Sequence, residues 1–242
     1  MTALIRTRGL GKYYLLGGQR LRVLSDISIR IARGEMVAFT DDDCQARPDW
    51  IGQVAGAFLE NPGVAAVTGG ILPDPRLLPS GIDPRILAAV TWHPEERRLF
   101  RGKVDPGLAG GGLNLSLRTS WVERIGPFDP DLGPGALHRG AEDTDFLYRL
   151  LCAGGAILYD PEVVVSHLPW REEKAQSEVE LEYGHGISAW ALKWAVQGDL
   201  FPAWIALKVL VSQGRRALSG SLRGDRAAAR TGRVCGQPSA SS

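Results

Sequence analysis

Short apolar runs alternate with segments of helical spacing through the middle of the chain, and this alternation most constrains its fold. Runs typical of buried strands cover residues 36–40, 64–72, 113–117, 156–159 and 162–166. Between the runs at 113–117 and 156–159, residues 142–153 place apolar side chains on one helical face, and Gly154-Gly155 follows where a helix would end. Strands that alternate with helices indicate a layered α/β domain.

A helix is also expected after the first strand. Pro48 stands where a first helical residue would, and Asn61-Pro62-Gly63 would stop the helix. The side chains expected to face the core at helical spacing are Trp50, Ile51, Val54, Phe58 and Leu59. A shorter helix is expected through Trp121, Val122 and Ile125.

Composition excludes several classes of protein. Of the 242 residues, 44% are hydrophobic and 23% charged, which is typical of a soluble globular chain. The net charge of +1 argues against a nucleic-acid partner bound through a basic field. Three widely spaced cysteines offer neither a disulfide framework nor a zinc spacing. Without a signal peptide or an apolar run of about 18–20 residues, we expect a cytoplasmic protein.

Three aspartates, Asp41 to Asp43, come directly after the first apolar run. In extended backbone, side chains two residues apart point the same way, so Asp41 and Asp43 would converge and Asp42 would turn away. Clustered carboxylates favour Mg²⁺ or Mn²⁺. The alternative is a solvated acidic turn, but three repelling charges after a buried strand would be relieved by a bound cation.

Two other positions carry functional groups. Glu142-Asp143-Thr144-Asp145 opens the helix over 142–153, where acidic residues also serve as caps and complement the helix dipole. Taken alone, the capping role is the stronger interpretation of these acidic residues. His167 follows a β-branched run and precedes Pro169. A lone histidine is usually structural, but ligand-binding groups collect at strand ends in open α/β sheets.

Taken together, these segments resemble a known family. FTDDDCQARPDWI, then GGGLNLSLRTSWVERIGPFDPDLG, then GAEDTDFLYRLLCAGGAILYDPEVVVSHLPW resemble the second half of family 2 glycosyltransferases of the GT-A fold. The resemblance covers about residues 34–172 and continues more weakly to about 234. It implies an incomplete GT-A-like mixed sheet with flanking helices and a C-terminal helical segment. It also implies a metal-dependent, inverting transfer of a sugar from a nucleotide-sugar donor to a glycan or lipid-linked acceptor.

The resemblance implies a role for each matching residue. Asp41 and Asp43 match the metal-binding DxD element, and His167 matches a late histidine that completes the metal site in some members. The expected cofactor is therefore Mn²⁺ or Mg²⁺. Asp143 matches the catalytic base. The residues expected to contact substrate are Gly111, Gly112, Asn114 and Glu142.

Trp92, in the segment 91–103, is a further candidate for substrate binding. Its ring could stack on an acceptor sugar. A solvated loop held by one anchoring tryptophan is the favoured alternative.

Residues 1–39 resemble another family, the opening β-strands of ATP-binding-cassette transporter ATPases, with an adenine-stacking aromatic near Tyr13 or Tyr14. The phosphate-binding GxxxxGK[ST] motif of those enzymes occurs nowhere in the chain, which excludes an ATPase. We interpret the chain as an ATPase start joined to a truncated transferase, and the alternative is a divergent transferase. Only 40 residues precede Asp41, so the nucleotide-binding half of a complete enzyme is missing and donor binding could be impaired.

The C-terminal part is apolar and then basic. Two helical segments over 183–213 are interrupted by Gly198-Asp199 and Pro202. Six arginines against Asp225 give residues 214–234 a net charge of +5. These helices could lie peripherally on the inner face of a membrane, or they could pack as a hairpin, which we slightly favour.

We therefore divide the chain into four parts and consider more than one function for it. The expected parts are 1–39, an ATPase-like β segment; 34–172, the transferase half; 173–213, a helical segment; and 214–242, a basic tail. The rival to a transferase is a non-catalytic fusion remnant or interaction module. An accessory piece of a transporter rests on residues 1–39 alone and is weaker.

Overall fold

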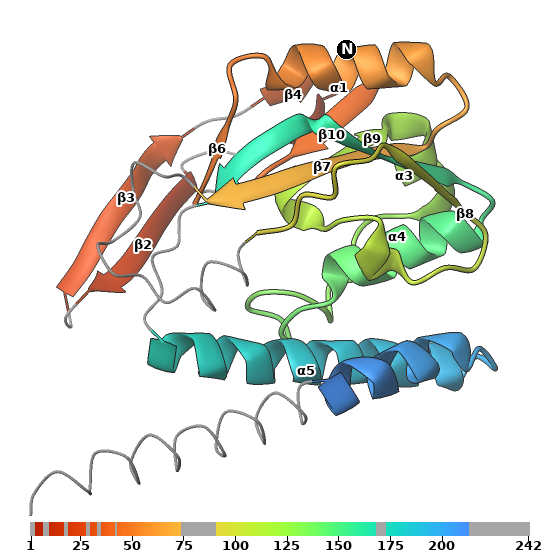
Figure 1. The fold of residues 1–242 in the computed structure, drawn as a ribbon. Coiled ribbons are helices and arrows are strands. Elements are labelled where there is room, and N and C mark those ends of the chain that lie inside the picture. Colours follow the sequence, from red (N-terminus) through yellow and green to blue (C-terminus); the bar gives the residue numbers. More distant parts are fainter. Residues whose placement is uncertain are drawn as a thin grey trace, which may run out of the picture. The chain divides into compact units, whose positions relative to one another are not determined.

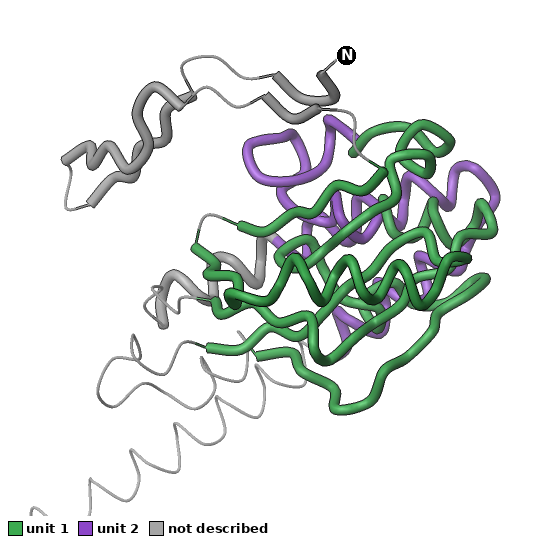
Figure 2. The backbone as a smooth tube through the Cα atoms, turned by 90° about the horizontal axis from the view of Figure 1, so that it is seen from above, with its two compact units in different colours: residues 1–128, 146–170 green, residues 129–145, 171–242 purple. Residues whose placement is uncertain are grey.

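The computed structural model (Figure 1) describes the chain in several stretches, and residues 3–32 and 173–182 are described by their backbone alone. The described residues are 3–6, 10–16, 19–27, 30–32, 35–41, 43–73, 91–167 and 173–212. Figure 2 shows two compact units. The first comprises Met1–Phe128 and Phe146–Trp170, and the second comprises Asp129–Asp145 and Arg171–Ser242.

A six-stranded mixed sheet forms the first unit. Its strands are β5 (Met36–Phe39), β6 (Cys44–Ala46), β7 (Ala66–Pro73), β8 (Arg98–Arg101), β9 (Leu115–Arg118) and β10 (Ala156–His167). The order is β5-β9-β7-β10-β6, and β8 also pairs with β10. β7 and β10 are parallel, while β9 is antiparallel to both of its neighbours and β6 and β8 are antiparallel to β10. The predicted mixed sheet is confirmed.

The connection between β5 and β6 requires the sheet to curl. Three strands separate these two in the order, yet only residues 40–43 join them along the chain. Five Cα–Cα steps reach at most about 18 Å. Four strand-to-strand steps in a flat sheet would span about 19 Å. The aspartate segment therefore crosses from one edge strand to the other only because the sheet is curved.

Helices cover both faces of this sheet (Figure 1). α1 (Trp50–Glu60) packs on one face through a cluster that includes Phe58, Val67 and Leu158. α4 (Glu142–Cys152) supplies Phe146 and Leu150 to a second cluster. α3 (Thr119–Ile125) adds partly buried side chains to that second cluster. Because neighbouring residues of a strand point to opposite faces, β7 and β10 each contribute to both clusters.

Several predicted elements differ in detail from the structure. Ile51 and Leu59 of α1 are 63% and 80% exposed, so their predicted place in the core was wrong. Trp50, Val54, Ala57 and Phe58 form a narrower buried stripe. The two strands predicted at 156–159 and 162–166 are one strand, β10, whose register shifts between Asp160 and Val164. β6 and β8 were not predicted, because each is a short edge strand without an apolar run.

The irregularity in β10 depends on a glycine in β7. Gly69 faces the shifted stretch, and a Cβ placed on it would lie 1.8 Å from the Val163 carbonyl oxygen. No side chain fits there without moving backbone. A Cβ placed on Gly70 would lie 2.2 Å from the His93 ring. The pair of glycines thus permits the bulge that bends the two central strands.

The chain before the sheet forms two antiparallel strand pairs. β1 (Ala3–Arg6) pairs with β4 (Arg30–Ala32), and β2 (Leu10–Leu16) pairs with β3 (Gln19–Ile27).

The second unit contains α5 (Glu173–Ala195) and a further helix over 201–212. They are interrupted where the sequence predicts, with Gly198 at a φ of 88° and Pro202 in the first turn of the second helix. No helix among the described residues is long and apolar enough to cross a membrane. The predicted basic tail, 214–242, lies outside the described residues.

Candidate active site

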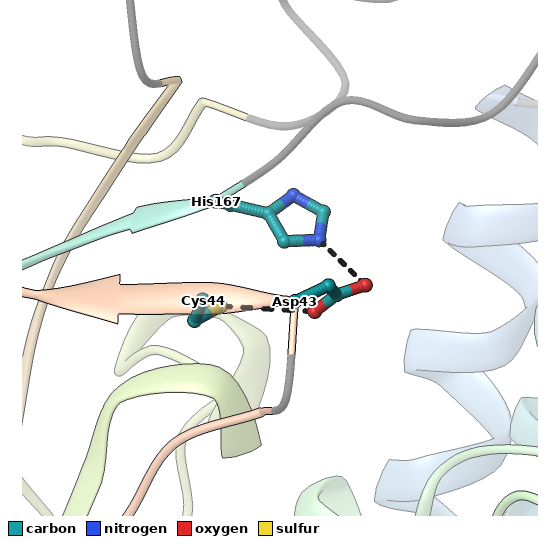
Figure 3. A group of neighbouring side chains, drawn as sticks. All are labelled: Asp43, Cys44 and His167. Carbon is teal, nitrogen blue, oxygen red and sulfur yellow. Dashed lines mark hydrogen bonds and ion pairs between the residues drawn. The ribbon is translucent and has the colours of Figure 1, made fainter. Parts of the chain in front are cut away.

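The pairing of β6 with β10 brings Asp43 beside His167. Cys44 faces His167 in the antiparallel register, so the residue before Cys44 lies at the end of β10. The Nε2 atom of His167 is 3.4 Å from Oδ2 of Asp43 (Figure 3). Both side chains are largely buried. Two residues that the sequence places 124 positions apart therefore meet in one small cluster.

Cys44 completes this cluster, although nothing in the sequence singles it out beyond its place next to Asp43. Its thiol points to Oδ1 of Asp43 at 3.9 Å (Figure 3). Burial, followed by the charges of Asp43 and Asp41, raises the pKa of the Cys44 thiol to about 12. The thiol is therefore a neutral donor at physiological pH. Ligand atoms of Asp43, Cys44 and His167 all lie within 4.8 Å of one another.

Asp41 belongs to a turn, and not to the extended backbone on which its predicted convergence with Asp43 was based. Its carbonyl oxygen accepts a hydrogen bond of 3.1 Å from the Cys44 amide. The residue is exposed, and its charge acts on the Cys44 thiol together with that of Asp43. Asp42 lies outside the described residues. The turn thus keeps both predicted carboxylates near Cys44 by a different backbone path.

The donor set at Asp43 and His167 fits a divalent cation. Two ligands in neighbouring positions on Mn²⁺, each at about 2.1–2.2 Å, lie about 3 Å apart, close to the observed 3.4 Å. Within the described part of the chain, Nδ1 of His167 is buried and has no hydrogen-bond partner. An imidazole nitrogen favours Mn²⁺ over Mg²⁺, which prefers oxygen ligands, and a hard cation selects carboxylate over thiol.

The side chain of Asn114, which was expected to contact the substrate, is buried and hydrogen-bonded to other residues of the fold. Asn114 is 1% exposed, and its side chain accepts a hydrogen bond of 2.9 Å from Nε1 of Trp50. Its amide donates to the carbonyl oxygens of Gly70 and Val163 at 3.0 and 2.8 Å. These bonds connect α1, β7 and the bulge of β10. The predicted role of Asn114 in substrate binding remains a prediction.

Gly111 and Gly112 stand where the chain enters a 3₁₀ turn, Gly112–Asn114, directly before β9. The preceding Gly110 has a φ of 118°, and a Cβ there would lie 2.8 Å from the Thr68 side chain. The hydroxyl of Thr68 donates to the Ala109 carbonyl oxygen. The glycine-rich segment is therefore held close against β7, and its predicted contact with the sugar stays a prediction.

Trp92 anchors its segment to the sheet. Its ring lies edge-on to that of Tyr159, with centroids 4.6 Å apart, and its backbone exchanges two hydrogen bonds with Ile71. The ring also packs against the core cluster of α1. This arrangement is the anchoring alternative considered from the sequence, and stacking on an acceptor remains a prediction.

Glu142 and Asp143 lie in the second unit, at the first turn of α4. The residue before them, Ala141, has a φ of 66° and is the only non-glycine residue with positive φ among those described. Such strained backbone costs about 1–3 kcal/mol and clusters at functional sites. Oδ1 of Asp143 accepts hydrogen bonds from the amide and hydroxyl of Thr144 at 2.7 and 3.3 Å. These bonds fix the orientation of the expected base.

Asp145 has a partner that the sequence did not indicate. It is fully buried, and Nζ of Lys193 lies 2.9 Å from its Oδ1 and 2.6 Å from Oδ2 of Asp129. Trp194 also donates to Oδ1 of Asp145 at 3.1 Å. The interpretation of Asp145 as a helix cap therefore gives way to a buried ion cluster that joins α5 to the start of α4 within the second unit.

Comparison with known proteins agrees with the resemblance to glycosyltransferases that the sequence shows. Residues 25–104 match the family model described as Glycosyl transferase family 2. The chain is 28% identical over 199 residues to "Succinoglycan biosynthesis protein ExoM" of Rhizobium meliloti, which covers 76% of this chain and 60% of that protein. It is 27% identical over 150 residues to "Glucosyl-dolichyl phosphate glucuronosyltransferase" of Haloferax volcanii, covering 57% and 44% respectively.

A solved structure is also similar, namely "Mannosyltransferase PcManGT from Pyrobaculum calidifontis in complex with GDP-Man and Mn2+". Its TM-score is 0.45 at 17% identity, over 83% of this chain and 55% of that one, and a likeness at this level carries no argument.

The chain is therefore similar to family 2 glycosyltransferases, by the family model over residues 25–104 and by its relatives, and it spans between 44% and 60% of the length of these curated relatives. The resemblance of residues 1–39 to a transporter ATPase has no support. The family match begins at residue 25, inside that segment.

Proposed function

We propose that this chain is a metal-dependent, inverting glycosyltransferase domain that moves a sugar from a nucleotide-sugar to a glycan or lipid-linked acceptor. The observation that carries the proposal is the meeting of Asp43 with His167 at 3.4 Å, in a chain that is similar to family 2 glycosyltransferases. A carboxylate and an imidazole whose second nitrogen is unpaired within the described residues are a fitting set for a divalent cation.

Each proposed residue has a chemical task. Asp41, Asp43 and His167 would hold Mn²⁺ or Mg²⁺, and the bound cation would stabilise negative charge on the departing diphosphate. Asp143 would accept the proton of the acceptor hydroxyl as that oxygen attacks the anomeric carbon, a contribution of about 10²–10⁴ in rate. Glu142, Gly111 and Gly112 would line the substrates.

The acceptor and its location follow from the relatives. One is named for succinoglycan biosynthesis and the other for a glucosyl-dolichyl phosphate, which supports a glycan or a lipid-linked acceptor. An acceptor of the second kind would bring the enzyme into peripheral contact with the inner face of a membrane from the cytoplasm. The fusion of residues 1–39 stays a hypothesis.

Calorimetric titration of UDP-, GDP- and dTDP-sugars into the purified chain, with and without Mn²⁺, tests this function. We expect saturable binding of one donor class that requires the metal. Asp43→Asn, His167→Gln and Asp41→Ala should remove it. Asp143→Asn should leave binding unchanged and lower transfer by about 10²-fold or more.

Glu95→Gln is the matched control, because it neutralises an exposed carboxylate of the first unit outside the cluster. It should bind donor like the wild-type chain. Absence of donor binding by a folded sample, at any metal concentration, would leave a non-catalytic fusion remnant or interaction module as the better description.

A further inference from the structure

We propose that one face of the helix over residues 201–212 is the surface that docks on anionic lipid. The face consists of large exposed apolar side chains of this helix, namely Trp204, Leu207, Leu210 and Val211, and Leu200 directly before the helix extends it. The proposal deepens the proposed function, from which it takes the lipid-linked acceptor, by naming the surface and the charge of its partner.

Spacing places these side chains together. Residues 200, 204, 207 and 211 follow one another at four-, three- and four-residue steps, which align on one side of a helix. Leu200, Trp204 and Leu207 are 68%, 52% and 60% exposed. The opposite side of the same helix, Pro202, Ile205 and Ala206, is buried. The helix is thus buried along one apolar side and exposed along a second one.

The outward face has the composition of an interfacial helix. Trp204 is the residue type that gathers at the boundary between lipid headgroups and acyl chains. Nζ of Lys208 lies 4.2 Å from the centre of its ring, so a cation accompanies the aromatic group. Long basic side chains can keep their charge at the headgroups while their stems lie on apolar surface. Between residues 200 and 212 the sequence contains no acidic residue.

Charge decides between lipid and a second copy of the chain. The sequence continues from this helix into residues 214–234, whose net charge is +5. Two copies joined through this face would bring two such concentrations of arginine together, which is unfavourable. An anionic membrane surface attracts them instead. The apolar face and the adjoining charge therefore fit the same partner.

Vesicle flotation of the full chain tests this assignment. The probe is phosphatidylcholine vesicles with and without phosphatidylglycerol. We expect the wild-type chain to float with the anionic vesicles and to remain in solution with the neutral ones. Leu207→Glu should lower the partition coefficient at least about tenfold, because it removes a leucine that the lipid would bury and adds a charge that anionic lipid repels. Trp204→Ala should lower it in the same direction.

Leu59→Glu is the control, since this leucine of α1 is also exposed and lies in the first unit. It should float like the wild-type chain. Equal flotation of the Leu207→Glu variant, or equal binding to neutral vesicles, would overturn the proposal. The proposal would also be overturned if the wild-type chain bound no vesicles but formed a dimer that the Leu207→Glu substitution dissociates. Metal-dependent donor binding by Leu207→Glu should be unchanged, so failure of the docking surface and failure of the transferase function are distinguishable.

Discussion

At the scale of single residues, the clearest dependence is that of Asp145 on Lys193. Asp145 is fully buried, and the lysine ammonium lies within 3 Å of both Asp145 and Asp129. Lys193→Met keeps much of the side-chain volume and removes the ammonium that faces the two carboxylates. A buried ion pair that loses one partner costs about 3–5 kcal/mol, because the remaining charge stays desolvated. We expect the free energy of unfolding, measured in urea, to fall by that amount.

Lys208→Met is the control for this residue. Lys208 is exposed and its ammonium lies over the Trp204 ring. A change at such a surface position is expected to stay within about 0.5 kcal/mol. If the two variants unfolded at the same urea concentration, the cluster around Asp145 would not hold α5 to the start of α4.

At the scale of elements, the bulge in β10 makes a glycine of β7 indispensable. Gly69→Ala would place a methyl group 1.8 Å from the Val163 carbonyl oxygen and 2.7 Å from Nδ2 of Asn114. Backbone must move, and with it the hydrogen bond of 2.8 Å between Asn114 and Val163. We expect a loss of about 3 kcal/mol or more, or failure to fold, by thermal and urea unfolding.

Gly56→Ala provides the matched comparison for this element. Gly56 lies inside α1, and a Cβ there would have nothing within 4 Å. The substitution should stabilise the chain by about 0.5–1 kcal/mol, because alanine loses less backbone freedom in a helix. A tolerated Gly69→Ala would mean that the central strands do not depend on the close approach seen here.

The sequence predicts the elements better than the contacts between them. β5, β7, α1, α4 and the break at Gly198 follow from apolar spacing, glycine and proline, which act locally. β6 could not be predicted, because its three residues become a strand only by pairing with β10. The same pairing creates the approach of Asp43 to His167, so each residue was a candidate from its strand end while their contact, and the place of Cys44, came from tertiary structure.

At the scale of the whole molecule, a bound cation should appear as stability. A ligand that binds only the folded chain raises the free energy of unfolding by about 2.7 kcal/mol at one hundred times its dissociation constant. Saturating Mn²⁺ should therefore raise the melting temperature of the wild-type chain, measured by circular dichroism, even if donor binding is weak. Asp43→Asn should abolish the shift because it removes one of the two groups that meet at 3.4 Å.

Asp143→Asn separates this effect from catalysis. Asp143 belongs to the second unit and has no proposed metal contact, so its variant should show the full Mn²⁺ shift while losing transfer. Mg²⁺ should give a smaller shift than Mn²⁺, since one of the proposed ligands is an imidazole. A wild-type chain whose melting temperature is unchanged by both cations would show that Asp43 and His167 only contact each other between β6 and β10, and that the proposed metal site does not bind a cation in this chain.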